Sequence, residues 1–201
     1  REKAPLAATK DMFLDSEGNV IKGKSTQTAL AIGVPGTIAG VFAVHKKYGT
    51  MPISKILEPV IALAERGVVV TKKQEKSLRD YHESIVKING EDSPASKAYK
   101  ENDTIKYPAL ARTLKRIQKK GRNEFYKGET AKILVEYLQQ KGGIITMADL
   151  AKYEAKWRKP LQFTYKDLKI TSMAPPSSGG ICLAQILKML EPYDLAKMGH
   201  N

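Results

Sequence analysis

Cysteine is almost absent from this sequence. Cys182 is the only cysteine among 201 residues, so no disulfide can form within the chain. The three histidines come without a cysteine cluster or an HExxH spacing, so no set of zinc ligands can be recognised, and we expect no metal and no cofactor. Because Cys182 lies in the apolar run 181–184, we expect it to be a small buried hydrophobic residue.

Long hydrophobic stretches are missing as well. No apolar run approaches the roughly 20 residues that a membrane-spanning helix needs, so we expect no membrane span in this segment. The sequence shows no signal peptide, but it begins with Arg1 rather than methionine, and the true N-terminus can therefore lie further upstream. The missing signal peptide excludes no location.

Basic residues outnumber acidic ones, with 34 Lys and Arg against 21 Asp and Glu and a formal net charge of +13. Such an excess suits nucleic acid, anionic lipid or an acidic protein. The densest basic cluster lies between Arg112 and Arg122 at helical spacing, which favours a solvated helix face over a phosphate-binding one. No RNP, KH or zinc-finger pattern accompanies it, so we expect no nucleic-acid partner.

The periodicity of apolar residues predicts a helix-rich α+β fold in three parts. Residues 1–36 predict a sheet-associated start with a buried strand at 29–34, residues 37–157 a helical region, and residues 158–201 a hairpin, a Pro-Pro-Ser-Ser-Gly-Gly turn and a helix. The helices are expected over residues 37–48, 55–66, 72–88, 109–120, 132–140, 147–153 and 181–190.

Local signals predict where several of these helices begin. Ser54, Thr71 and Thr146 each precede a helical pattern and are candidate N-caps. Pro59 lies inside the second pattern, where a proline removes one backbone hydrogen bond and favours a kink.

The turn Ser177-Ser178-Gly179-Gly180 is a candidate site, because it joins a predicted strand to a predicted helix. Backbone N–H groups gather at a helix N-terminus and can bind an anion or an oxyanion. The motif is neither the GxxxxGK[ST] phosphate loop nor GxSxG. We favour a structural turn over a direct substrate contact.

Other titratable residues point to structure rather than to chemistry. We expect His45, on an apolar helix face, to be structural. The carboxylates Glu65, Asp80, Glu124 and Asp149 fall in helical or capping contexts, and nothing in the pattern selects one of them as a general base.

Six segments, in order and with compatible spacing, resemble the γ-glutamyltranspeptidase family: residues 1–5, 33–40, 47–52, 124–128, 142–146 and 175–180. The resemblance implies an N-terminal nucleophile (Ntn) hydrolase, in which two sheets lie between helical layers in an αββα sandwich. It also implies a precursor that cleaves itself into a large and a small subunit, with an N-terminal threonine of the small subunit as the nucleophile. The family's Thr-Thr-His context does not occur here, so we expect an interior fragment of the large subunit that carries no catalytic residue.

The resemblance assigns one substrate residue to this segment. In the family's Arg-Glu-x-Ala-Pro motif the arginine binds the α-carboxylate of the γ-glutamyl group, and it matches Arg1. The implied substrates are glutathione and other γ-glutamyl compounds, and the implied partner is the small catalytic subunit of the same precursor. Bacterial relatives are usually exported, which implies a periplasmic or secreted protein.

Two other interpretations stay open at this point. The chain can be a non-catalytic helical module whose basic face binds nucleic acid or an acidic protein, or a degenerate family member that keeps the scaffold and has lost the threonine.

Overall fold

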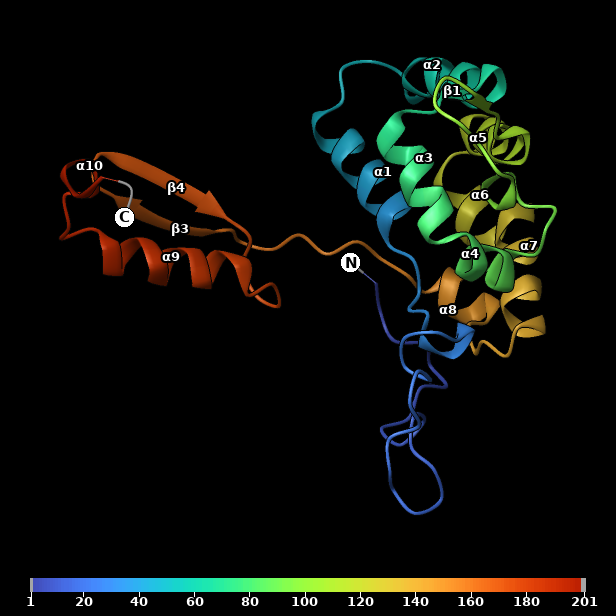
Figure 1. Ribbon diagram of the computed structural model, residues 1–201, viewed down its shortest axis with the longest axis horizontal. Helices are drawn as coiled ribbons and strands as arrows, with labels where there is room; N and C mark the ends of the chain where they lie inside the picture. Colours follow the sequence, from blue (N-terminus) through green and yellow to red (C-terminus); the bar gives the residue numbers. More distant parts are fainter. Residues whose placement is uncertain (1, 200–201) are drawn as a thin grey trace. The chain divides into compact units, whose positions relative to one another are not determined.

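The chain forms two compact units, Arg1–Ala155 and Lys156–Asn201, in a computed structural model that describes residues 2–199 (Figure 1). The division lies close to residue 158, where the sequence predicts the change from helices to a hairpin. Each unit is described here by itself.

The first unit is mainly helical. Its described part contains α1 (Thr37–Tyr48), α2 (Ile53–Arg66), α3 (Lys72–Asp80), α4 (His82–Asn89), α5 (Pro108–Lys120), α6 (Arg122–Lys127), α7 (Glu129–Gln140) and α8 (Met147–Ala151). Two 3-10 helices, η1 (Ala29–Ala31) and η2 (Pro94–Ser96), and one antiparallel pair of two-residue strands, β1 (Val68–Val69) and β2 (Thr104–Ile105), complete it. Apart from the one over residues 72–88, the helices predicted in this unit are confirmed with shifts at their ends. The sequence analysis predicts no helix at α6, and β1 and β2 are too short to leave a pattern in the sequence.

The segment before α1 is irregular and projects from the helices as a long loop, coloured blue in Figure 1. The buried strand predicted at residues 29–34 is wrong, because residues 29–31 form η1. Within this run Val34 alone forms a β-bridge, an isolated antiparallel one with Lys3. A strand needs a paired neighbour along its length, and this segment has one for a single residue.

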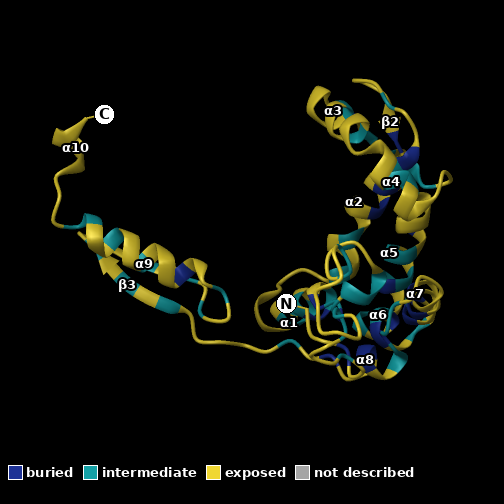
Figure 2. Cartoon of the chain, turned by 60° about the horizontal axis from the view of Figure 1, so that its bottom comes forward, coloured by how far each residue is buried: buried dark blue, intermediate teal, exposed yellow. Residues whose placement is uncertain are grey.

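The larger core cluster lies around α6, α7 and α8, where Figure 2 shows the buried residues gathering. It comprises Val34, Ala39, Tyr126, Ala131, Val135, Leu138, Ile145, Leu150 and Tyr153. A smaller cluster packs Ile61 and Ala64 of α2 against Ala111 of α5. On α7 the inward face is built from Ala131, Val135 and Leu138, whereas Ile133 and Tyr137 are exposed.

Tyr126 is fully buried and joins segments that are far apart in the sequence. Its ring stacks on Tyr153 at a centroid distance of 5.6 Å, and the guanidinium carbon of Arg122 lies 4.4 Å from its centroid. Its hydroxyl donates to the Pro35 carbonyl at 2.9 Å and accepts from the Ala39 N–H at 3.1 Å. The first turn of α1 and the residues before it are therefore fixed by one side chain of α6.

Two of the predicted helix caps are confirmed. Thr71 and Thr146 each form a capping box, with Gln74 in α3 and Asp149 in α8. The cap predicted at Ser54 is wrong, because α2 already begins at Ile53 without a side-chain cap. The helix predicted over residues 72–88 is divided at Tyr81 into α3 and α4.

The second unit consists of the hairpin β3 (Leu161–Tyr165) and β4 (Leu168–Ser172), with α9 (Gly179–Leu190) and the short α10 (Leu195–Met198). The strands pair antiparallel with Phe163 opposite Ile170, as the alternating pattern predicts. Cys182 is exposed, so the prediction that it is buried is wrong. The better-buried positions of α9 are Gly180, Ala184 and Leu187, and Cys182 does not share their spacing.

We expect Tyr126→Phe to lower the free energy of unfolding by about 2 kcal/mol, because it leaves the buried Ala39 N–H without an acceptor. Urea unfolding measures this loss. The matched control is Tyr137→Phe, whose ring is 44% exposed and which should stay within about 0.5 kcal/mol of the wild type. Equal effects of the two variants would contradict the role assigned to the Tyr126 hydroxyl.

Candidate functional site

Arg1, the predicted substrate-binding residue, lies outside the described residues, but the residues that follow it are fixed to the first unit. The Lys3 N–H donates to the Val34 carbonyl at 3.2 Å, and the Val34 N–H donates back to Lys3 at 2.7 Å. A Cβ on Gly33 would lie 3.0 Å from the Cβ of Glu2, so a side chain at position 33 would press on this segment. The motifs at 1–5 and 33–40 are therefore in direct contact.

Asp149 provides a second contact that fixes the segment after Arg1. Its Oδ1 accepts from the Leu6 N–H at 2.6 Å, across 143 positions of sequence. Its Oδ2 accepts from the backbone N–H and the hydroxyl of Thr146, at 2.8 and 2.7 Å. Burial raises the pKa of Asp149, but the bonds from Thr146 and Leu6 outweigh burial and hold the pKa below its usual value. The sequence predicted the cap and missed the contact with Leu6, which no local pattern reveals.

Glu124 is a second buried charge of the first unit, with 1% of the residue exposed. Its Oε1 accepts from the N–H and the hydroxyl of Thr130, both at 3.1 Å, and from Nε of Arg116 at 3.2 Å. Nζ of Lys120 lies 3.4 Å from Oε2. A Cβ on Gly128 would collide with the same carboxylate, which explains the glycine in the motif 124–128. Glu124 is therefore a structural charge, in agreement with the prediction that no pattern marks it as a base.

The turn Ser177-Ser178-Gly179-Gly180 leads from the hairpin into α9. Ser178 is the N-cap residue, and its side chain makes no capping hydrogen bond. Gly180 is buried, and a Cβ there would collide with the Met173 carbonyl and lie 3.2 Å from Oγ of Ser172. At Gly179 an added Cβ would make only an ordinary contact with Ser177, at 3.6 Å. These contacts support the structural interpretation of the turn at Gly180, and a substrate contact stays a prediction.

The two histidines in the described part of the chain, His45 and His82, each form a hydrogen bond with a backbone carbonyl outside their own helix. Nε2 of His45 lies 2.7 Å from the Met51 carbonyl, so His45 of α1 closes the loop that contains the motif 47–52. Nε2 of His82 lies 2.9 Å from the Ser96 carbonyl. His200 lies outside the described residues.

The basic cluster of α5 and α6 is largely engaged within the chain. Lys115 pairs with Glu65 at 2.5 Å, Arg116 and Lys120 pair with Glu124, and Arg122 donates to the Tyr153 carbonyl. These partners favour the predicted helix face over a phosphate-binding face.

Within residues 2–199 no group of three or more His, Cys, Asp and Glu residues is arranged to hold a metal ion. No helix in this part of the chain is long and apolar enough to span a bilayer.

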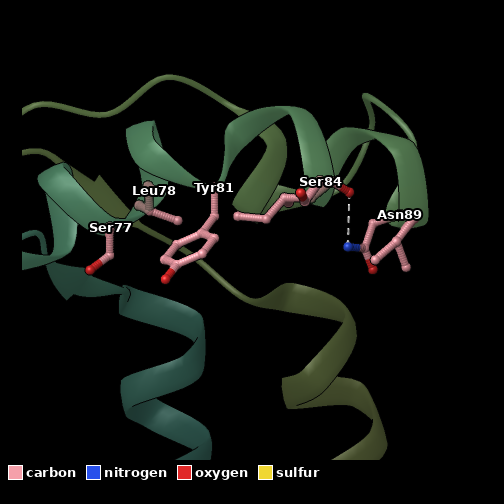
Figure 3. Close-up of a pocket in the computed structure, with 7 residues that line it drawn as sticks. Ser77, Leu78, Tyr81, Ser84 and Asn89 are labelled. Carbon is pink, nitrogen blue, oxygen red and sulfur yellow. Dashed lines mark hydrogen bonds between the residues drawn. The ribbon is translucent and has the colours of Figure 1, made fainter. Parts of the chain in front are cut away.

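An open apolar groove of about 410 Å³ runs along α3 and α4 (Figure 3). It is lined by Ser77, Leu78, Tyr81, Ser84, Ile85, Ile88 and Asn89. The Asn89 amide donates to the Ile85 carbonyl of its own helix at 3.0 Å. The lining contains no charged side chain and no histidine, so Ser77 and Ser84 have no base in this groove that would activate them.

Comparison with known proteins gives a match along the whole chain. The model of the family described as Gamma-glutamyltranspeptidase matches residues 1–201. The glutathione hydrolase proenzyme of Escherichia coli is 42% identical over 204 residues, which cover 99% of this chain and 35% of the relative. The chain thus spans about a third of the length of this curated relative.

Solved structures give the same result. The crystal structure of Helicobacter pylori γ-glutamyltranspeptidase matches with a TM-score of 0.94 and 43% identity, over 100% of this chain and 59% of that chain. The γ-glutamyltranspeptidase from Pseudomonas nitroreducens, complexed with L-DON, matches with a TM-score of 0.85 and 39% identity, over 95% of this chain and 57% of that chain. These likenesses confirm the predicted α+β fold of the Ntn hydrolase type.

We expect Gly180→Ala to destabilise the second unit by about 1–3 kcal/mol, because the new methyl group overlaps a backbone carbonyl that cannot turn away. Hydrogen exchange of the amides of β3, β4 and α9 measures the effect locally. Gly179→Ala, one position earlier in the same helix turn, should leave this exchange nearly unchanged. Equal protection in both variants would contradict the packing role of Gly180.

We expect Glu124→Gln to lower the free energy of unfolding at neutral pH by about 3 kcal/mol, because Arg116 and Lys120 lose a buried partner. Burial raises the pKa of Glu124, yet the bonds from Thr130 and Lys120 hold it below its ordinary value of 4.5. A lowered folded-state pKa stabilises the fold above the ordinary value and stops doing so as the pH falls through the lowered one.

The difference between wild type and Glu124→Gln should therefore shrink as the pH falls below the ordinary value of 4.5, in urea unfolding at each pH. Glu65→Gln is the matched control, because the Lys115–Glu65 pair is half-exposed and should contribute less than about 1 kcal/mol. A difference that did not change with pH would refute the assignment.

Proposed function

The chain belongs to the γ-glutamyltranspeptidase family, and we propose that the complete protein cleaves the γ-glutamyl amide of glutathione and related compounds. The observation that carries this proposal is the match along the whole chain, at 42% identity to a protein named glutathione hydrolase proenzyme. The six motifs, which occur in the order of the family, support the proposal. The structure adds that two of them, at 1–5 and 33–40, are in contact.

The proposed reaction uses a threonine that lies outside this chain, at the N-terminus of a small subunit released from the same precursor. The threonine oxygen attacks the γ-carbonyl carbon, its proton passes through a base to the departing amine, and a γ-glutamyl ester of the enzyme forms. Water or an acceptor amine then attacks this ester, which gives hydrolysis or transfer and restores the threonine hydroxyl. The name proenzyme, carried by the relative from E. coli, supports a precursor that is processed.

This chain contributes substrate binding and the scaffold behind it. We assign Arg1 to the α-carboxylate of the γ-glutamyl group, because a guanidinium presents two parallel N–H donors to a carboxylate and keeps its charge at every physiological pH. The fixed backbone of Lys3 and Leu6 supports this assignment, since a binding side chain needs a rigid base. The intramolecular partners of the basic cluster speak against the alternative of a basic binding module.

We expect Arg1→Lys in the complete protein to raise KM for a chromogenic γ-glutamyl anilide by about tenfold to a hundredfold, with little change in thermal stability. The reason is that lysine replaces a planar two-point contact, worth about 1.5–3 kcal/mol, with a single point charge. Steady-state kinetics and a melting curve measure the two effects.

The matched control is Lys3→Gln, which removes a neighbouring cation and keeps the backbone bridge to Val34, and it should leave KM within about twofold. Failure of the wild-type protein to release the anilide would refute the proposed function. A normal KM in Arg1→Lys would refute only the role of Arg1.

A further inference from the structure

The backbone after Arg1 is fixed at two points that are three residues apart. Lys3 forms two hydrogen bonds with Val34, and the Leu6 N–H donates to Oδ1 of Asp149 at 2.6 Å. Between them Pro5 is buried, and the Pro5 carbonyl accepts from the Ala8 N–H at 3.1 Å in a turn. Proline has no N–H and a fixed φ, so little freedom remains between the two points. Only Glu2 separates Arg1 from the first of them.

The two oxygens of the Asp149 carboxylate have different partners. Oδ2 accepts both bonds from Thr146 and so completes the capping box of α8. Oδ1 is directed at Leu6, which belongs to another part of the sequence and is itself 61% exposed. A residue that only caps a helix needs the bonds between Oδ2 and Thr146, and not the bond between Oδ1 and Leu6. The capping box of α3 shows the ordinary case, since the hydrogen bonds between Thr71 and Gln74 all lie within the cap.

We propose that Asp149 is a positioning residue for substrate binding, which fixes the backbone at Leu6 and thereby sets the place of the arginine at position 1. This inference rests on the proposed function, because it takes Arg1 as the group that binds the substrate carboxylate. Asp149 does not touch the substrate and acts through the segment 2–6. The bond from Leu6 to a charged oxygen is of the stronger kind, and the buried carboxylate has little room to follow if the segment moves.

The expected consequence is a loss of substrate affinity rather than of chemical rate. Consecutive Cα atoms are about 3.8 Å apart, and only a few residues separate Leu6 from Arg1. A displacement of the backbone at Leu6 is therefore passed on to Arg1 over a short distance. A shift of about 1 Å in a positioned group can reduce the efficiency of an enzyme by as much as a hundredfold. The carboxylate of the donor would be held less well, whereas the threonine on the other subunit would remain in place.

The test compares variants of the complete, processed protein with a chromogenic γ-glutamyl anilide as donor. Asp149→Ala removes the acceptor for Leu6 together with the cap, and Thr146→Ala removes the side-chain bonds of the cap while leaving Oδ1 to Leu6. We expect both variants to melt at lower temperature. Asp149→Ala should raise KM by about tenfold with kcat within about twofold, whereas Thr146→Ala should raise KM by less than about twofold.

A second pair of variants tests the contact from the other side, without touching α8. Leu6→Pro removes the donor N–H at the second position of the turn closed by Ala8 and Pro5, where the fixed φ of proline is accommodated. It should reproduce the rise in KM with a smaller drop in melting temperature than Asp149→Ala, because the cap of α8 remains intact. Leu6→Ala keeps the N–H and should keep the KM of the wild type. If Asp149→Ala fails to fold, the comparison of Leu6→Pro with Leu6→Ala shows whether the contact of Leu6 with Asp149 affects KM.

Thr71→Ala removes a cap of the same kind in α3 and serves as the control for stability alone. An unchanged KM in both Asp149→Ala and Leu6→Pro, in an active protein whose Arg1→Lys variant is impaired, would overturn the inference and leave the proposed function intact. Equal changes of KM in Asp149→Ala and Thr146→Ala would also overturn it. An inactive wild type, or a normal Arg1→Lys variant, would instead refute the function on which the inference rests.

Discussion

The buried hydroxyl of Tyr126 is the interaction on which the arrangement of the first unit depends. It donates to the Pro35 carbonyl and accepts from the Ala39 N–H, so it fixes the backbone on both sides of the point where α1 begins. An unpaired N–H at this depth would lower stability by about 1–3 kcal/mol, which is a large part of the net stability of a domain. Val34, one residue before Pro35, is thereby placed to pair with Lys3.

From this point hydrogen bonds lead in short steps to the segment 2–6, which follows Arg1, the residue proposed to bind the substrate. Tyr126 of α6 holds residues 35–39, Val34 holds Lys3, and Asp149 of α8 holds Leu6. The supports behind the segment 2–6 thus come from α6, α8 and the residues before α1. All of them belong to the first unit, in which the larger core cluster packs the same helices together.

The sequence predicts those elements whose causes are local. Helix periodicity, the capping residues Thr71 and Thr146 and the alternation of β3 and β4 each depend on neighbours within a few positions, and each is confirmed. Two of the errors, at residues 29–34 and at Cys182, concern pairing and burial, which depend on residues distant in sequence. The run 29–34 fails to form a strand because only Val34 finds a partner, and Cys182 is exposed because the better-buried positions of α9 have a different spacing.

The candidate site shows the same limit. A role for Arg1 could be proposed from its motif, whereas the contacts that hold the segment after it join positions 143 and 91 residues apart and leave no periodic signal. Glu124 could be given a helical or capping context but could not be recognised as a buried charge, because its partners Arg116 and Thr130 belong to the neighbouring helices α5 and α7.

A double-mutant cycle between Arg1 and Asp149, measured as KM for a γ-glutamyl donor, tests the central claim most directly. If Asp149 acts through Arg1, removing Asp149 should change KM markedly in the wild type and hardly at all once Arg1 has been replaced by alanine. The account therefore predicts strongly non-additive effects. Additive effects of the two substitutions would contradict it.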